Sequence, residues 1–267
     1  MPIRRSPDNW EGGRGLSIND SVEVVGGGQR NRGSGLGRDG FLWDGSLGTT
    51  PITVNSLWNE LTGINDNGLA VGWGQSPSFV DAFTWDDASG TTLLGKEGGT
   101  SSYAFGINDL GQVVGSKQYD VGGGQFGMQI ATLWSDPLSW IQIGDLSGGI
   151  ERSEAVAINE KKQVVGWGTT DSGEEAFYWD ELAGLVSLAD LVDDSLTGWT
   201  LIRANAINDS GWIGGAGINP QGGVEGFVLI PEALVPVPAT VGLILFGLVG
   251  IGSQRWILKK AALTHAV

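Results

Sequence analysis

The sequence contains no cysteine and a single histidine, His265, which lies among its last three residues. Without cysteine there can be no disulfide framework, no thiol nucleophile and no cysteine-based zinc site. A lone histidine at the end of the chain also excludes a Ser-His-Asp triad and histidine-ligated metal sites. These absences exclude most familiar hydrolase mechanisms, and we expect no cofactor and no metal.

Positive charge is also scarce, because 15 lysines and arginines stand against 30 aspartates and glutamates, for a net charge of −15. No basic stripe is available to neutralise phosphates, so we expect no nucleic-acid binding. One local exception is a group of arginines near the start: Arg4, Arg5, Arg14, Arg30, Arg32 and Arg38. Since glycine and serine separate these arginines, we favour a solvated loop over a binding patch.

Glycine is abundant, with 46 residues in a chain of 267, while the hydrophobic fraction of 40% is ordinary. This composition excludes a collagen-like or disordered chain and indicates a β protein with many turns. Self-comparison reveals a phrase, Ile-Asn-Asp or Ile-Asn-Glu, that recurs five times at intervals of 43 to 51 residues. Its asparagines are Asn19, Asn65, Asn108, Asn159 and Asn208. A glycine follows each of them seven positions later, at Gly26, Gly72, Gly115, Gly166 and Gly215.

Two further phrases complete the repeat. An Ala-Phe-x-Trp type of strand follows each glycine, and its tryptophans are Trp43, Trp85, Trp134 and Trp179. A fourth apolar segment closes the first four units, whereas the fifth unit ends after its third strand, at Ile230. Because the phrases alternate apolar and polar residues with a period of two, each unit predicts four short strands, with the recurring tryptophans in the core.

The Ile-Asn-Asp phrase has the chemistry of a tight turn. Asparagine and aspartate can cap their own turn, and the glycine at Gly68, Gly111 and Gly211 supplies a positive φ angle. The other two copies have Val22 and Lys162 at that position, so we expect those turns to be costlier or of another type.

Repeated four-stranded units of this length are typical of a β-propeller, and a β-solenoid, with coils of about 20 to 30 residues, is the alternative. We therefore predict an all-β propeller of about five four-stranded blades, incomplete at the N-terminus, plus a C-terminal hydrophobic helix. The missing fourth strand of the fifth unit leads us to expect that an N-terminal strand closes the ring.

The repeat resembles the HAF extracellular repeat of bacteria over about residues 11–231, through its Ala-x-x-Ile-Asn-x-x-Gly-x-Val-Val-Gly and Ala-Phe-x-Trp phrases. The His-Ala-Phe of that family is here Asp81-Ala82-Phe83 and Glu175-Ala176-Phe177. The resemblance implies a secreted or surface protein, and it carries no known catalytic residues.

The composition changes after Pro231, which divides the chain into a repeat domain (1–231), a proline-containing linker (232–238), an apolar helix with a basic end (239–260) and a tail (261–267). Twenty residues from 239 to 258 would form a helix of about 30 Å, enough to span a bilayer. Its basic flank comprises Arg255, Lys259 and Lys260, which predicts a cytoplasmic C-terminus. A buried core helix or a hydrophobic strand is the alternative.

The linker and helix resemble the PEP-CTERM sorting signal, in a VPVPA-type variant. The motif residues are Val235, Pro236, Val237, Pro238, Ala239 and Thr240. The resemblance implies recognition by an exosortase, transient anchoring in the inner membrane, and display at the cell surface or release from a Gram-negative bacterium that makes exopolysaccharide. Residues 1–15 contain no apolar signal-peptide region, so we expect that the true start lies upstream.

These features together predict an exported, non-catalytic surface or extracellular-matrix protein that binds polysaccharide or another surface component. Its ligand candidates are the tryptophans that we interpret as non-repeating: Trp58, Trp73, Trp167 and Trp199. The alternative is a propeller-type glycosidase or lyase with paired carboxylates. Since Asp66, Asp109 and Asp209 recur and turn chemistry explains them, we assign no catalytic residue. Calcium binding at 190–194 is a further option, with a solvated loop as the default.

Overall fold

The computed structural model describes residues 10–31, 36–45, 48–52, 54, 58–75, 79–120, 127–231 and 256–258. Its strands form five consecutive four-stranded units, numbered here as blades 1 to 5, within which neighbouring strands pair antiparallel. Blade 1 contains β1 (Trp10–Ile18), β2 (Val24–Asn31), β3 (Leu36–Trp43) and β4 (Thr49–Ile52). Blade 2 contains β5 (Trp58–Ile64), β6 (Ala70–Gln75), β7 (Val80–Asp86) and β8 (Gly90–Leu93). The repeat predicted from the sequence is therefore the structural unit.

The remaining blades follow the same plan. Blade 3 contains β9 (Ser101–Ile107), β10 (Val113–Tyr119), β11 (Met128–Asp136) and β12 (Ser139–Gly144). Blade 4 contains β13 (Glu154–Ile158), β14 (Val164–Thr170), β15 (Gly173–Asp180) and β16 (Gly184–Ser187). Two short 3-10 helices, η1 (Leu188–Leu191) and η2 (Asp194–Leu196), lead to blade 5, which contains β17 (Thr200–Ile207), β18 (Ile213–Ile218), β19 (Val224–Pro231) and β20 (Trp256–Leu258).

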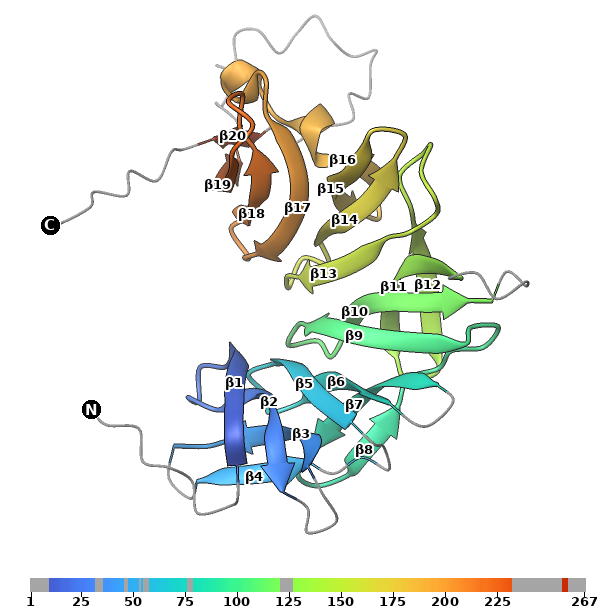
Figure 1. Cartoon of the computed structure of the whole chain (residues 1–267), viewed down its shortest axis with the longest axis vertical. Helices are drawn as coiled ribbons and strands as arrows, with labels where there is room; N and C mark the ends of the chain where they lie inside the picture. The colour runs from blue at the N-terminus through green and yellow to red at the C-terminus, as the bar shows by residue number, and fades with distance from the viewer. Residues whose placement is uncertain are drawn as a thin grey trace, which may run out of the picture.

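The five blades lie side by side in an arc around a common axis, as Figure 1 shows. The first strand of each blade contacts the first strand of the next, so β1, β5, β9, β13 and β17 lie along the inside of the arc. This is the arrangement of a β-propeller, in which sheets pack face to face around an axis. The alternative of a solenoid is wrong.

The core is divided among the junctions between blades. Four clusters of buried side chains each join one blade to the next, rather than filling a common centre. At the junction of blades 1 and 2, for example, Val25 of β2 packs against Leu61 and Phe83 of the following blade. Trp134 and Trp179 are buried as predicted, at 0% and 7% exposure. Each blade is thus stabilised by its neighbours, as in other repeat proteins.

The five glycines that follow the asparagines lie where a side chain has no room. At Gly26, for example, a Cβ atom would come within 1.9 Å of the carbonyl oxygen of Arg14 on the neighbouring strand β1. At each of the four equivalent glycines, a Cβ atom would come within 1.9 to 2.2 Å of the corresponding carbonyl oxygen in its own blade. A close approach of two strands therefore accounts for this glycine in every copy.

The turns after the asparagines have one conformation in all five blades. Gly68, Gly111 and Gly211 have φ angles of 76° to 77°, and Val22 and Lys162 adopt φ angles of 64° and 59° at the same position. Positive φ is unfavourable for a side chain, and most of all for a β-branched one. The expected cost of these two turns is therefore present, without a change of turn type.

The fifth blade differs from the prediction in two ways. It has a fourth strand, because β20 pairs with β19 from Pro231↔Trp256 to Leu229↔Leu258. Residues 256–258 had been assigned to the end of a helix over 239–260, and for these three residues that assignment is wrong. The rest of the expected helix, together with the sorting motif, lies outside the described residues. No helix among the described residues is long and apolar enough to cross a membrane.

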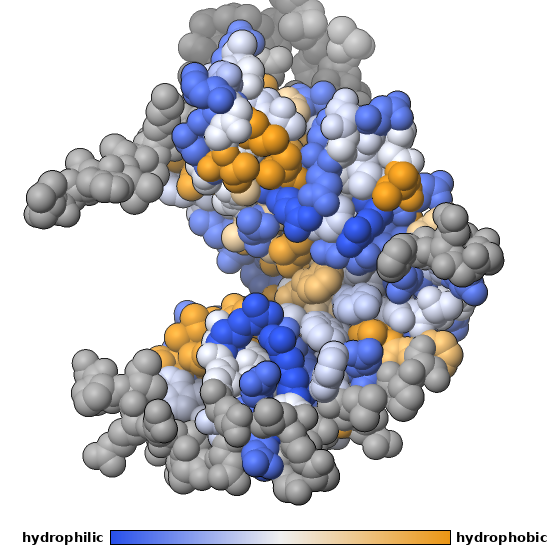
Figure 2. Space-filling view, in the orientation of Figure 1, coloured by the Kyte–Doolittle hydropathy of each residue, from blue (hydrophilic) through white to orange (hydrophobic). Residues whose placement is uncertain are grey.

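The arc is open between blade 5 and blade 1, where Figure 2 shows a notch in the molecular surface. The face of blade 1 that borders the notch is the one that the preceding blade covers elsewhere. Ile18 is consequently 62% exposed, whereas the equivalent Ile64 and Ile158 are 6% and 7% exposed. Trp43 is 37% exposed for the same reason, in contrast to Trp134. The predicted ring closure by an N-terminal strand is not seen in the described part of the chain.

Candidate functional site

The repeated asparagines form a hydrogen-bonded series at one end of the arc. The Asn19 amide donates to the carbonyl oxygen of Asn65, and the same bond recurs from each blade to the next at 2.9 to 3.1 Å. Within each turn the asparagine Oδ1 also accepts backbone N–H groups, as Asn65 does from Asn67 and Leu69. The asparagines therefore cap their own turns, as predicted, and in addition join neighbouring blades.

The acidic residue after each asparagine makes a second set of links. The backbone N–H of Asp20 donates to Asp66, and the series continues through Asp109 and Glu160 to Asp209 at 2.6 to 2.9 Å. The prediction that these acids cap their own turns is wrong for the last four, whose carboxylates accept from the preceding blade instead. A shallow hollow of about 220 Å³ lies among these motif residues. We interpret it as a consequence of the scaffold, since bonds between blades occupy its polar groups.

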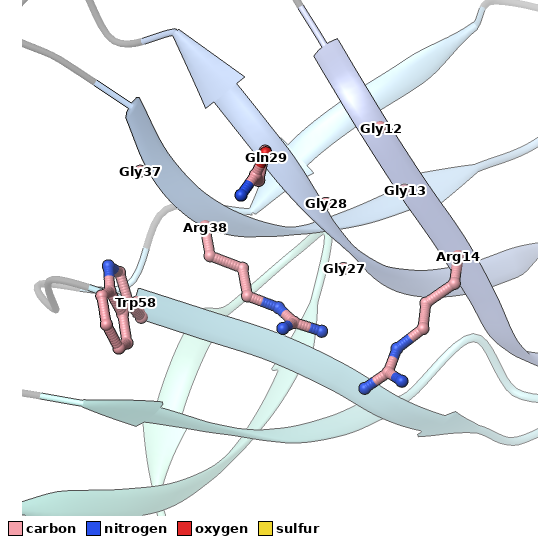
Figure 3. A pocket seen from close by; sticks show the side chains of 9 residues that line it. All are labelled: Gly12, Gly13, Arg14, Gly27, Gly28, Gln29, Gly37, Arg38 and Trp58. Carbon is pink, nitrogen blue, oxygen red and sulfur yellow. The ribbon is translucent and has the colours of Figure 1, made fainter.

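A larger hollow, of about 600 Å³, lies between blades 1 and 2 (Figure 3). Its lining combines the backbone of several glycines with the side chains of two arginines, a glutamine and a tryptophan. The residues are Gly12, Gly13, Arg14, Gly27, Gly28, Gln29, Gly37, Arg38 and Trp58. We call it the Arg–Trp pocket. Its volume falls in the range of known small-molecule sites.

Blade 1 contributes a glycine to the pocket lining at a position where two other blades have tryptophan. In register, Gly27 of β2 corresponds to Trp73 of β6 and to Trp167 of β14, since each directly follows the close-approach glycine. Trp167 is 2% exposed and fills its own junction. At Gly27 a Cβ atom would lie 2.9 Å from the Glu60 side chain, so Glu60 takes part of the space that the indole group takes in blade 4.

Glu60 of β5 lies at the base of the pocket, between two guanidinium groups. Arg14 of β1 donates to it at 3.1 and 3.3 Å, and Arg38 of β3 donates at 2.5 Å. The Glu60 side chain is only 4% exposed, whereas those of Arg14 and Arg38 are 62% and 37% exposed. The hydrogen bond and the charge of Glu60 raise the pKa of Arg14 above its ordinary value. The geometry therefore holds two cations around one anion.

A second ion pair supports the outer strands of blade 1, where Arg30 lies 3.6 Å from the fully buried Asp39. The predicted solvated loop is thus wrong for Arg14, Arg30 and Arg38, which lie on three paired strands and form ion pairs. The other three arginines of the group, Arg4, Arg5 and Arg32, lie outside the described residues.

Of the four candidate tryptophans, only Trp58 lines the pocket. It begins β5, is 53% exposed, and lies beside Arg38, with which it forms a parallel bridge between the blades. Trp73 packs on Tyr103, at 5.9 Å between ring centroids, and Trp199 packs against the core between blades 4 and 5. Trp73 and Trp167 also occupy equivalent positions, so describing them as non-repeating was wrong.

The remaining sites predicted from the sequence are the acidic segment 190–194 and the C-terminal sorting motif with its basic flank. Asp193, in the acidic segment 190–194, caps η2 by accepting from the Ser195 N–H. Among the described residues, no group of three or more acidic or histidine side chains is arranged to hold a metal ion. The sorting motif Val235–Thr240 and the basic residues Arg255, Lys259 and Lys260 lie outside the described residues.

Comparisons with known proteins identify the fold. No family model matches the sequence, and no curated protein matches it. Among solved structures, the chain is similar to the β-propeller domain of the Trilobed protease from Pyrococcus furiosus, which has an open velcro topology. The match has 13% sequence identity and a TM-score of 0.52, and it covers 82% of this chain and 68% of that one. At this identity the likeness shows the fold alone, and the chain is a β-propeller.

Proposed function

We propose that this protein is an exported, non-catalytic surface or extracellular-matrix protein, and that it binds polysaccharide in the Arg–Trp pocket. The observation that supports binding most directly is Trp58, a half-exposed indole at the edge of a hollow of about 600 Å³. An exposed aromatic ring offers a flat apolar surface beside polar groups, which suits the face of a sugar ring. None of the nine lining residues is acidic, so the pocket offers no carboxylate pair for glycoside hydrolysis.

Export is supported by the resemblance of the repeat to HAF extracellular repeats and of the tail to a PEP-CTERM signal. In this proposal an exosortase recognises the motif Val235–Thr240 while the helix over 239–260 anchors the chain in the inner membrane. Because residues 256–258 pair with β19, anchoring requires β20 to leave blade 5. The bacterium is Gram-negative, and the natural ligand is an exopolysaccharide or another surface polymer.

Binding is tested with the full chain and a panel of purified polysaccharides, by affinity electrophoresis and calorimetry. We expect at least one polymer to bind, and Trp58→Ala to weaken that binding about tenfold, the effect of removing about 1.4 kcal/mol. The matched control is Trp212→Ala, because Trp212 is 46% exposed on blade 5 and lies outside the pocket. Absence of binding to every polymer, or equal loss in both variants, would contradict the proposal.

A second variant tests the pocket itself. A Cβ atom at Gly12 meets nothing within 4 Å, so Gly12→Trp adds bulk at the margin of the pocket without a clash at its base. Gly214 of blade 5 is equally open and serves as the control, as Gly214→Trp. We expect only the first variant to lose binding.

Sorting is tested by expressing the chain with and without an exosortase and following its size and its location. Replacing both Pro236 and Pro238 by alanine is expected to prevent processing. If the unaltered chain is neither processed nor found in the membrane or outside the cell, the export part of the proposal fails.

A further inference from the structure

The Arg–Trp pocket lies in the least acidic part of the chain. The first 52 residues contain six arginines and six acidic residues, so they are neutral, and the remaining 215 residues have the entire net charge of −15. An anion that approaches the protein is therefore repelled least at blade 1.

Within the pocket the local balance is positive. Arg14 and Arg38 reach over β5 from two different strands (Figure 3). Both donate hydrogen bonds to the carboxylate of Glu60. The two guanidinium groups share this carboxylate, and the Arg14 side chain, 62% exposed, leaves part of its guanidinium group open to the solvent.

The equivalent junction between blades 4 and 5 lacks this excess. There the corresponding pair is Glu174 and Arg203, one anion with one cation, joined by three hydrogen bonds of 2.7 to 2.9 Å. Glu154 occupies the position of Arg14 and accepts from the Trp167 indole at 3.1 Å. At the position of Arg14 this junction therefore has an anion in place of a cation, and Trp167 stands at the position of Gly27.

The same pocket also offers an aromatic surface. Trp58 and Arg38 are neighbours across the bridge between β3 and β5. In Figure 3 the indole group lies at one end of the pocket, and the guanidinium groups follow along β5, so a polysaccharide that stacks on Trp58 and continues along the pocket reaches them. Guanidinium groups bind carboxylates and sulfates through paired N–H donors, whereas a neutral sugar has no group that needs two cations.

We infer that the Arg–Trp pocket takes an anionic sugar unit of an acidic polysaccharide, with its ring on Trp58 and its acidic group on the outer side of Arg14 and Arg38. This inference rests on the proposed polysaccharide binding and adds the charge of the ligand. A uronate carboxylate and a sulfate ester share the required chemistry, and the experiment separates them.

The experiment measures binding of the full chain to polygalacturonate, dextran sulfate and neutral dextran, at low salt and at about 0.5 M salt, where charges are screened within about 4 Å. We expect at least one acidic polymer to bind at least tenfold more tightly than dextran, and this preference to shrink at high salt. The acidic polymer that binds more tightly identifies the acidic group.

The decisive variant is Arg14→Gln, which leaves Glu60 paired with Arg38. We expect about a tenfold loss of affinity for the acidic polymer, with no change in the unfolding temperature beyond a few degrees. Arg203→Gln is the matched control, because it removes an arginine at the same repeat position in blade 5 and outside the pocket. Its affinity should equal that of the unaltered chain.

Three outcomes overturn the inference and differ in what they leave standing. If dextran binds as tightly as the acidic polymers and Trp58→Ala abolishes that binding, the ligand is neutral and the proposed function survives. If no polysaccharide binds under any condition, both fail. Equal affinity of the Arg14→Gln chain and the unaltered chain also overturns the role of the guanidinium cluster.

Discussion

The junction between blades 4 and 5 and the junction between blades 1 and 2 are built from the same repeat positions, yet one is filled and the other is hollow. In the first, the Trp167 ring lies near the guanidinium groups of Arg152 and Arg203, at 5.5 and 4.5 Å from its centroid. In the second, Gly27 replaces the tryptophan, and the positions of Glu174 and Arg203 are taken by Arg38 and Glu60, with the charges exchanged. Departures from the repeat, rather than the repeat itself, therefore create the candidate site.

The largest expected effect comes from making the filled junction hollow. Trp167→Gly removes an indole that is 2% exposed and leaves a cavity, so the free energy of unfolding should fall by about 4 kcal/mol. Urea titration followed by circular dichroism measures the loss. Trp212→Gly is the control, since Trp212 is 46% exposed and should cost about 1 kcal/mol or less. Similar losses in both variants would mean that Trp167 does not fill its junction as described.

The exchanged ion pairs predict the next effect. Glu60→Gln removes the carboxylate that pairs with both Arg14 and Arg38, at a position with 4% exposure, so we expect a loss of about 3 kcal/mol. Glu174→Gln breaks the pair at the same position of the other junction, where both side chains are about 40% exposed, and should cost about 0.5 kcal/mol. Urea unfolding of both variants compares them directly. Equal costs would show that burial does not distinguish the two pairs.

The next comparison concerns the asparagine hydrogen bonds, which all four junctions between blades share. Asn159 is 4% exposed, donates to Asn208 and Gln163, and accepts the N–H groups of Lys161 and Gln163. Asn159→Ala leaves buried backbone groups without these partners and should lower the free energy of unfolding by about 2 kcal/mol.

The matched variant at the open end is Asn208→Ala, where the side chain accepts from the Trp212 N–H and is exposed. It should cost about 0.5 kcal/mol, because no link to a following blade is lost. A cost at Asn208 as large as that at Asn159 would indicate that the arc closes in solution.

The features that recur were predictable from the sequence, because each appears four or five times in register. The asparagine turns, the close-approach glycines and the buried Trp134 and Trp179 all follow from periodicity and residue chemistry. Links between blades were less predictable, since nothing local to Asp66 shows that its carboxylate accepts from Asp20. Pairing of that kind depends on how neighbouring blades approach each other.

The candidate site was harder to predict, because it arises from a missing side chain. Gly27 is one of three consecutive glycines and resembles any other loop residue until β2 is placed beside β5. Arg14 and Arg38 are 24 positions apart in the sequence, and only the pairing of β1, β2 and β3 brings them together. Likewise β20 is separated from β19 by 24 residues, a proline-containing linker followed by an apolar, helix-like stretch, so local pattern alone favoured a helix over 239–260.

The last comparison concerns the position two residues after the close-approach glycine. Every other blade has glycine two residues after the close-approach glycine, including Gly28 in the Arg–Trp pocket, whereas blade 3 has Lys117. Its ammonium group lies 3.1 Å from the Trp140 ring centroid and donates to the Glu97 carbonyl oxygen at 3.2 Å. Burial lowers the pKa of Lys117 from 10.5 to about 8, although the charge of Glu97 opposes this shift.

Between pH 8 and pH 10.5 the unfolded chain therefore binds a proton at Lys117 that the folded chain does not bind. Because the unfolded state binds more protons in this range, this residue makes the free energy of unfolding rise with pH. Tyr119, 5.8 Å from the ammonium group, acts in the opposite direction above about pH 10, since burial raises its pKa.

The comparison is therefore made between pH 8 and 10, by urea titration of the unaltered chain and Lys117→Met. The difference in unfolding free energy between them should change steadily with pH, in favour of the unaltered chain. Lys161→Met, at an exposed turn, is the control and should show no such change; a constant difference for Lys117→Met would mean that its amine titrates alike in both states.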